Sequence, residues 1–237
     1  IQYVKVAITD IDGVLRGKYM HVDKFFQSID KGYGFCDVIF GWDSNDDLYD
    51  FKAFSGQDAF TGWHTGFPDQ TVSLVLDSER KIPFENNTLL YLSELKEADV
   101  CPRKALKTTL SLLEGLGFHG KSSLEYEFFL FRETPHSIRK KNFENLDSFS
   151  PGMFGYSILR NSVHSDFFNE ILDMCTIMDF PLEGLHTETG PGVIEAAISV
   201  DETLKSADKA VLFKTFMKVL AQKKEFMATF MAKWSEK

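Results

Sequence analysis

Apolar and polar residues alternate along the first twenty positions of the chain. Between Val4 and Thr9 every second side chain is apolar, and a second extended run follows the pair Asp12-Gly13. An Asp-Gly pair between alternating runs is the strongest short-range signal for a β-hairpin. We therefore expect two antiparallel strands within residues 3–20.

The pattern after this hairpin predicts a small β-rich unit. Asp23 is placed to cap a short helix that ends before Gly32. Residues 41–70 are rich in Gly, Asp, Ser and aromatic side chains, which predicts a long loop of the kind that is usually functional or mobile. Apolar runs at residues 72–76 and 89–92 predict two further strands.

A helical period replaces this alternation near residue 100. Pro102 suits the first position of a helix, leucines follow at helical spacing, and Gly117 can end it. The remaining pattern predicts a strand at 122–131, a helix at 162–179, two extended runs within 184–199, a helix from Ser206 to about Lys224 and a last strand after it. We expect an α+β chain with a small β-rich domain at residues 1–98 and a larger domain at 99–237.

The composition is that of a globular protein with an acidic surface. Hydrophobic residues make up 43% of the 237 residues, charged residues 26%, and the formal net charge is −9. This charge argues against nucleic acid and membranes as partners. Three widely spaced cysteines favour neither a disulfide framework nor a zinc site, so we expect a reducing, cytoplasmic compartment. No apolar run approaches the roughly 20 residues of a membrane span.

Two glutamates share one face of the strand expected at residues 122–131. Glu125 and Glu127 are two positions apart, so their carboxylates lie on the same side of a strand, about 7 Å apart. Such a pair can hold divalent cations through oxygen ligands. The alternative is a strand that turns its glutamates outward and its phenylalanines inward.

A second group of acids flanks a Gly-Pro-Gly turn. Glu188 precedes the turn, Glu195 follows it, and His186 shares the strand face of Glu188. If the segment folds back, the two carboxylates approach each other, and the glycines let the backbone come close to a ligand. An exposed polar hairpin is the alternative. Four carboxylates and one histidine on strands of one domain favour a site for two hard cations that bind phosphate oxygens.

Asp10-Ile-Asp12 raises a different possibility, the Asp-x-Asp nucleophile loop of a phosphatase. That chemistry also needs a later apolar strand that ends in an acidic pair, and the pattern predicts none. The alternating runs on both sides favour a hairpin turn with structural acids. Arg16 and Lys18, which follow the turn, are typical of a solvated strand end.

Seven segments of the chain together match one protein family in the family's own order. They are DIDGVLRGK, FGWDSND, GFPDQTVSLVLDSERKIPF, CPRKALK, LEYEFFLF, LEGLHTETGPGVIEAAI and TFMAK. In these segments the chain resembles the glutamine synthetases and their relatives, the γ-glutamyl amine ligases. The resemblance implies a β-grasp domain at residues 1–98. It also implies the first part of a catalytic α+β domain at 99–237, with a curved antiparallel sheet and flanking helices.

The resemblance assigns the carboxylates to cations and to glutamate. Glu127, Glu188 and Glu195 are similar to the ligands of the cation that holds substrate glutamate. Glu125 is similar to a ligand of the second cation, which lies on the ATP phosphates. Glu127, Glu188 and Gly190 are expected to bind the glutamate substrate itself.

The resemblance also implies a nucleotide side and a nitrogen side of the site. Glu183 and His186 are similar to residues that lie near ATP. Asp43 is similar to the catalytic acid that helps to bind ammonium across a subunit interface. Val193 stands where many members have Gln, a departure next to the last ligand.

The reaction that this resemblance implies joins the γ-carboxylate of glutamate to ammonia or a primary amine through γ-glutamyl phosphate. It uses ATP as a substrate and two or more Mg²⁺ or Mn²⁺ ions per site, in a ring-shaped homo-oligomer with active sites between subunits. The family continues beyond FMAKWSEK with further ligands and arginines, so we expect these 237 residues alone to be inactive. The alternatives are an inactive scaffold of the same fold and, remotely, the phosphatase.

Overall fold

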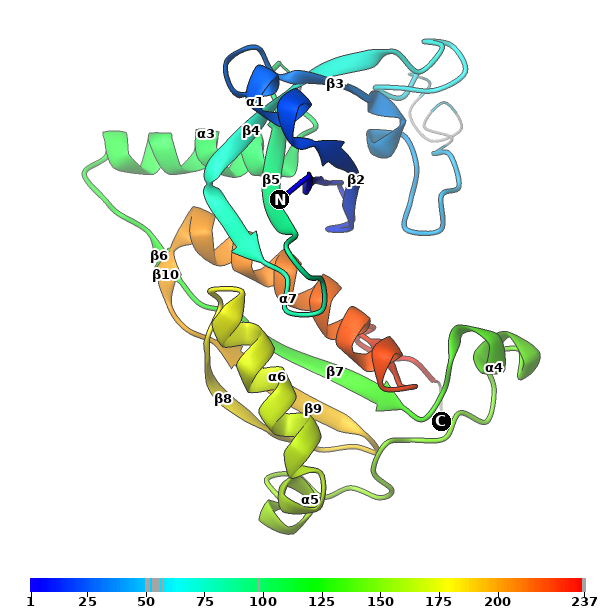
Figure 1. Ribbon diagram of the computed structural model, residues 1–237. Coiled ribbons are helices and arrows are strands. Elements are labelled where there is room, and N and C mark those ends of the chain that lie inside the picture. Colours follow the sequence, from blue (N-terminus) through cyan, green and yellow to red (C-terminus); the bar gives the residue numbers. More distant parts are fainter. Residues whose placement is uncertain (50–51, 53–55, 57, 98, 236–237) are drawn as a thin grey trace. The chain divides into compact units, whose positions relative to one another are not determined.

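The computed structural model describes residues 1–49, 52, 56, 58–97 and 99–235. It divides into two compact units, Ile1–Gly120 and Lys121–Lys237 (Figure 1). Helix α3 (Pro102–Gly115) therefore groups with the first unit, although it lies beyond the boundary expected between residues 98 and 99. That boundary rests on the change of sequence pattern and stays a prediction.

The first unit is built on a five-stranded sheet with the order β2-β1-β5-β4-β3. Its strands are β1 (Tyr3–Thr9), β2 (Leu15–His21), β3 (Tyr33–Cys36), β4 (Asp69–Lys81) and β5 (Leu89–Leu95). Strands β1 and β5 are parallel, and the other neighbours are antiparallel. The predicted hairpin is confirmed, because β1 and β2 pair from Tyr3–His21 to Thr9–Leu15.

Helix α1 (Val22–Lys31) packs on this sheet, and the short 3₁₀ helix η1 (Asp37–Phe40) follows β3. The ring of Phe25 lies 4.6 Å from that of Tyr91 on β5, within the buried core. The prediction that Asp23 caps this helix is wrong. The cap is His21, whose Nδ1 accepts the N–H of Asp23, because β2 runs directly into the helix.

The second unit is built on a four-stranded antiparallel sheet with the order β11-β7-β9-β8. Its strands are β7 (Glu125–Phe131), β8 (Leu182–Thr187), β9 (Val193–Ile198) and β11 (Met227–Thr229). A two-stranded ribbon joins β6 (Lys121–Ser122) to β10 (Asp201–Glu202). The helices are α4 (Pro135–Lys140), α5 (Ile158–Val163), α6 (Ser165–Ile177) and α7 (Thr203–Lys223).

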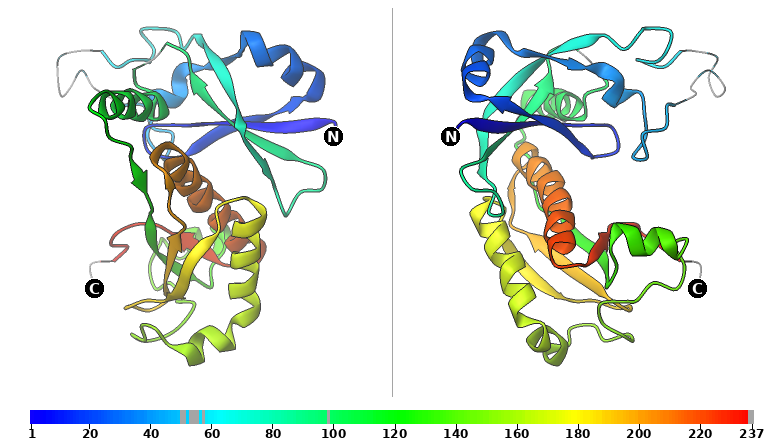
Figure 2. Two further views of the ribbon diagram at one scale, coloured as in Figure 1. Left: turned by 90° about the vertical axis from the view of Figure 1, so that its left-hand side faces the viewer. Right: turned by 45° about the vertical axis from the view of Figure 1, so that its right-hand side comes forward.

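Helices α6 and α7 lie alongside this sheet, and α7 builds the core with one of its faces (Figure 2). The fully buried ring of Phe213 on α7 stacks with Tyr126 and meets Phe128 edge-on, and both partners come from β7. Within the described residues, no helix combines the length and the apolar character that a membrane crossing requires.

Two predicted helix limits in this unit are wrong. The single helix expected at residues 162–179 is a pair, α5 and α6, which meet at His164, where the backbone leaves helical geometry. Ser206 does not cap α7, which begins three residues earlier, directly after the β10 ribbon strand. Ser206 is fully buried inside the helix instead.

Candidate active site

The sheet register brings three of the predicted site residues into one row. Glu127 of β7 pairs with Glu195 of β9, and Glu195 pairs in turn with His186 of β8. Directly opposed residues of antiparallel strands point to the same face, with Cα atoms about 4.5–5.5 Å apart. The three side chains therefore share the face that is opposite to the buried ring of Phe128.

The turn between β8 and β9 adds Glu188 to this face. The N–H of Glu188 donates to the carbonyl of Val193 at 3.0 Å and closes the turn. Gly190 has a φ of 139°, and a Cβ there would lie 2.7 Å from the side chain of Val193. Gly192 has a φ of 72°, and a Cβ there would lie 2.5 Å from the carbonyl oxygen of Leu130. The tight return of the chain thus requires glycine at both positions.

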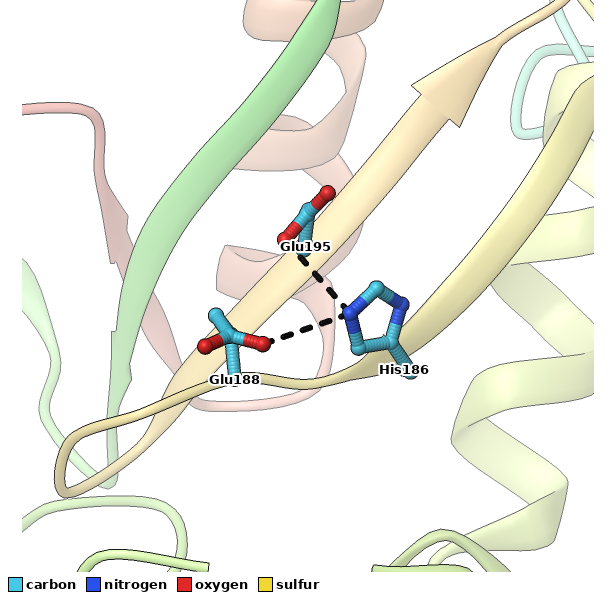
Figure 3. A group of neighbouring side chains, drawn as sticks. All are labelled: His186, Glu188 and Glu195. Carbon is cyan, nitrogen blue, oxygen red and sulfur yellow. Dashed lines mark ion pairs between the residues drawn. The ribbon is translucent and has the colours of Figure 1, made fainter. Parts of the chain in front are cut away.

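His186, Glu188 and Glu195 form a compact cluster, which Figure 3 shows. The Nε2 atom of His186 lies 3.4 Å from Oε2 of Glu188 and 3.4 Å from Oε2 of Glu195. One ligand atom from each of the three residues lies within 4.8 Å of the other two. The side chains of His186, Glu188 and Glu195 are half-buried, at 22%, 16% and 18% exposed.

Hydrogen bonding favours the ionised form of Glu188. The backbone N–H and the hydroxyl of Thr189 donate to this carboxylate, the hydroxyl at 2.8 Å, and together with His186 they lower the pKa of Glu188. The negative charge has an effect on a neighbour, because the carboxylates of Glu188 and Glu195, together with desolvation, raise the pKa of Tyr156. Glu188 is therefore a carboxylate anion at neutral pH.

Tyr156 is the site residue that the sequence pattern did not reveal. Its ring stacks on that of His186, with the centroids 4.4 Å apart and the planes 15° from parallel. Thr187 at the end of β8 holds this segment: its carbonyl accepts the N–H of Tyr156 at 2.7 Å, and its hydroxyl bonds Ser157 N–H and the carbonyl of Phe154. Tyr156 has a φ of 55°, and the local sequence carries no signal that predicts this positive value.

The donor set of the cluster fits a divalent cation. His186 Nε2 and Glu188 Oε2 are buried atoms without a hydrogen-bond partner among the described residues. Buried polar atoms without partners are costly, and a cation bound between them and Glu195 would satisfy both. Carboxylate oxygens suit Mg²⁺ and Mn²⁺, and imidazole nitrogen is a common ligand of divalent transition metals. The geometry thus groups His186 with the carboxylates, although the sequence resemblance placed it near the nucleotide.

The structure places the remaining predicted residues outside this cluster. Glu125 lies on the face of Glu127 one period along β7, paired with Ala197. Glu183 is exposed and lies at the irregularity in the pairing of β8 with β9. Asp43 belongs to the first unit, where it opens a turn that reaches Asp47.

The acids at the first hairpin are structural, as the alternating pattern predicted. Asp10 is fully buried, and its carboxylate accepts the N–H groups of Asp12 and Val14 and the Nε–H of Arg16. Such a carboxylate is unavailable as a nucleophile. The expectation that Arg16 is a solvated strand end is wrong, because its side chain is 16% exposed and lies 2.8 Å from the Asp10 carboxylate.

An α+β unit whose antiparallel sheet gathers carboxylates and an imidazole on one face defines a candidate metal-binding domain. The family that this domain represents is established by its sequence. The family model for "Glutamine synthetase, catalytic domain" matches residues 99–237, and the chain belongs to the glutamine synthetase family.

Known proteins of this family are similar along nearly the whole chain. Type-1 glutamine synthetase 2 of Dictyostelium discoideum is 45% identical over 236 residues, which are 98% of this chain and 44% of that protein. A glutamate–isopropylamine ligase of a Pseudomonas species is 31% identical over 98% of this chain and 51% of its own. The solved structure of GmaS with ADP covers 99% of this chain and 50% of its own, with a TM-score of 0.77 and 21% identity. This likeness confirms the predicted fold class, and the chain spans about half the length of these relatives.

Proposed function

We propose that the protein is an ATP-dependent ligase that joins the γ-carboxylate of glutamate to ammonia or a primary amine. The observation that carries this proposal is the convergence of His186, Glu188 and Glu195 on one sheet face, in register with Glu127. The family supports the same reaction class, since the relatives include a glutamine synthetase and a glutamate–amine ligase.

The residues of the second unit divide between two cations and the glutamate. Glu127, Glu188 and Glu195 would hold the cation beside glutamate, with His186 within reach of the same ion, and Glu125 would contribute to a second cation on the ATP side. When bound, the cations stabilise the charge of the phosphoryl group that moves from ATP to glutamate. Thr189 keeps Glu188 ionised for this task, because it donates two hydrogen bonds to the carboxylate.

The remaining roles concern substrates. Gly190, in the turn after β8, would leave room for the backbone to approach glutamate, and Glu183 on β8 would lie near the nucleotide. Asp43 would help to bind the nitrogen substrate across a subunit interface, at the active site of a neighbouring subunit in a homo-oligomeric ring. The γ-glutamyl phosphate that forms must be shielded from water until the amine attacks its carbonyl carbon and phosphate leaves.

The test is turnover by the full-length protein. ADP release is measured with ATP and glutamate in the presence of ammonia, isopropylamine and a series of other small primary amines, with Mg²⁺ or Mn²⁺. We expect glutamate-dependent turnover that increases with one nitrogen substrate and falls at least ~100-fold in Glu195→Gln. Glu144→Gln is the matched control, since Glu144 is an exposed residue of the same unit outside the site.

Two results would contradict the proposal. If the wild-type protein binds the metal ion but releases no ADP with any amine, the inactive scaffold is the better account. If Glu195→Gln retains full turnover while the protein is active, the cluster is not the site of the reaction.

A further inference from the structure

Arg16 links two parts of the first unit that are distant in sequence. On one side, Asp10 fixes the guanidinium: this carboxylate is fully buried and accepts the Nε–H of Arg16 at 2.8 Å. On the other side, a terminal N–H of Arg16 donates to the carbonyl of Asp43 at 3.1 Å, and a second one bonds the carboxylate of Asp46. A planar guanidinium is suited to this role, because its donors keep fixed directions.

The turn that Arg16 reaches is a closed local structure. The carboxylate oxygen Oδ1 of Asp43 accepts the N–H of Asn45 at 2.8 Å and that of Asp47 at 3.1 Å. The backbone of Asp43 also bonds both ways, since its N–H donates to the Asp47 carbonyl and its carbonyl accepts the Asp46 N–H. Both side-chain bonds end on Oδ1, so Oδ2 can accept a further donor.

The contacts of Arg16 define where this turn lies on the unit. The guanidinium lies over the ring of Trp42, the residue before Asp43, at 5.3 Å from the centroid. The turn pairs with itself through the bridge between Trp42 and Leu48. Hydrogen bonds inside the turn set its shape, and Arg16 connects that shape to the buried end of strand β1.

We propose that Arg16 is a positioning residue for Asp43 in the uptake of the nitrogen substrate. This rests on the proposed function, which assigns that substrate to Asp43. Arg16 ties the Asp10 turn to the main-chain carbonyl of Asp43, and so fixes the position of the turn that holds the Asp43 carboxylate. Without the guanidinium, Asp43 retains its charge and its local turn but loses its fixed place. Misplacing a substrate-binding group by about 1 Å can cost up to ~100-fold in rate.

Lys18 supplies a matched control on the same strand. Its Nζ donates to the Gly34 carbonyl at 3.2 Å and lies near the rings of Tyr33 and Phe35. Lys18→Gln therefore removes one positive charge from β2 without touching the Asp43 turn. Arg16→Gln removes the same charge together with the connection, and Arg16→Lys keeps the charge but cannot form the three-way fork.

The experiment compares these variants in the full-length protein, with KM measured separately for the nitrogen substrate, glutamate and ATP. We expect Arg16→Gln and Arg16→Lys to raise the KM for the nitrogen substrate about tenfold or more, with the other two KM values unchanged. Lys18→Gln should leave all three at wild-type values. Amide hydrogen exchange over residues 41–49 should accelerate in both Arg16 variants and not in Lys18→Gln.

The outcomes separate this proposal from the proposed function. If the wild-type protein turns over no amine, the function fails, and faster exchange over residues 41–49 still supports the connection through Arg16. If the wild-type protein is active but the Arg16 variants keep its KM for the nitrogen substrate, the positioning role is refuted. A loss of thermal stability alone, or an equal rise of all three KM values, refutes it as well.

Discussion

Removing one hydroxyl from Thr187 should release the Tyr156 segment from the site. Thr187→Val keeps the shape of a side chain that is only 5% exposed, but it deletes two hydrogen bonds: the one from Ser157 N–H at 3.1 Å and the one to the Phe154 carbonyl at 3.1 Å. Each such bond contributes about 1 kcal/mol net. The backbone bond from Tyr156 to Thr187 remains, so we expect about 1–2 kcal/mol less protection against local opening.

Amide hydrogen exchange measures this opening directly. A change of 1–2 kcal/mol corresponds to roughly 5- to 30-fold faster exchange at the amides of Tyr156 and Ser157. Thr176→Val is the control, because its hydroxyl donates to the carbonyl of Leu172 in α6, a bond within the helix that contributes little to helix stability. Unchanged exchange at Tyr156 in Thr187→Val, or an equal increase in the control, would refute the idea that Thr187 holds this segment.

Three further predictions concern the metal, the turn and the response to acid. Calorimetric titration of the full-length protein with Mn²⁺ should show binding that weakens at least ~10-fold in Glu195→Gln and not in the Glu144 control; equal affinities would remove the cluster as the site. Gly192→Ala should lower the free energy of unfolding by more than Gly66→Ala. Both glycines have φ near 70°, and the cost of that φ to alanine is about 1–2 kcal/mol at each position. Only at Gly192 would the Cβ also lie against a backbone carbonyl, at 2.5 Å, so equal thermal shifts of the two variants would contradict the steric argument. Burial of Glu133 alone would raise its pKa, but the hydrogen bonds to its carboxylate outweigh this desolvation and lower the pKa. The contribution of Glu133 to stability is therefore present above the usual pKa of 4.5 and is lost as the pH falls through the lower folded-state value. Glu133→Gln should flatten the acid limb of a plot of thermal stability against pH, and an unchanged limb would contradict this.

The sequence pattern predicted which glutamates and which histidine share a strand face, but it predicted neither the order of the strands nor the presence of Tyr156 at the site. A two-residue period places Glu125 with Glu127 and His186 with Glu188, and the turn residues predicted the return of the strand. The period cannot say that β9 lies between β7 and β8, since strand order depends on which apolar faces pack together. The period could not identify Tyr156 for a different reason: this residue lies 30 positions before His186, on a segment between β7 and β8, and its backbone has a positive φ.

The sequence pattern also failed to predict that Arg16 is shielded from solvent. A basic residue at the end of a short polar strand is exposed in most proteins, so the pattern favoured a solvated position. In the structure Arg16 is largely shielded from water because Asp10, which directly follows strand β1, is fully buried and requires a charged partner. Pairs of this kind are invisible to periodicity, because neither member belongs to an apolar face.

The same pairing that builds the core also aligns the candidate ligands. On the core face, Phe128 is opposite Ile194, and Ile194 is opposite Thr187, and these three side chains are fully or almost fully buried. A slip of one residue between β7 and β9 would turn the buried rings outward and the glutamates inward. The register is therefore selected by the hydrophobic face. The alignment of Glu127, Glu195 and His186 on the other face follows from it, so a core substitution that loosens the pairing should also disperse the metal-binding cluster.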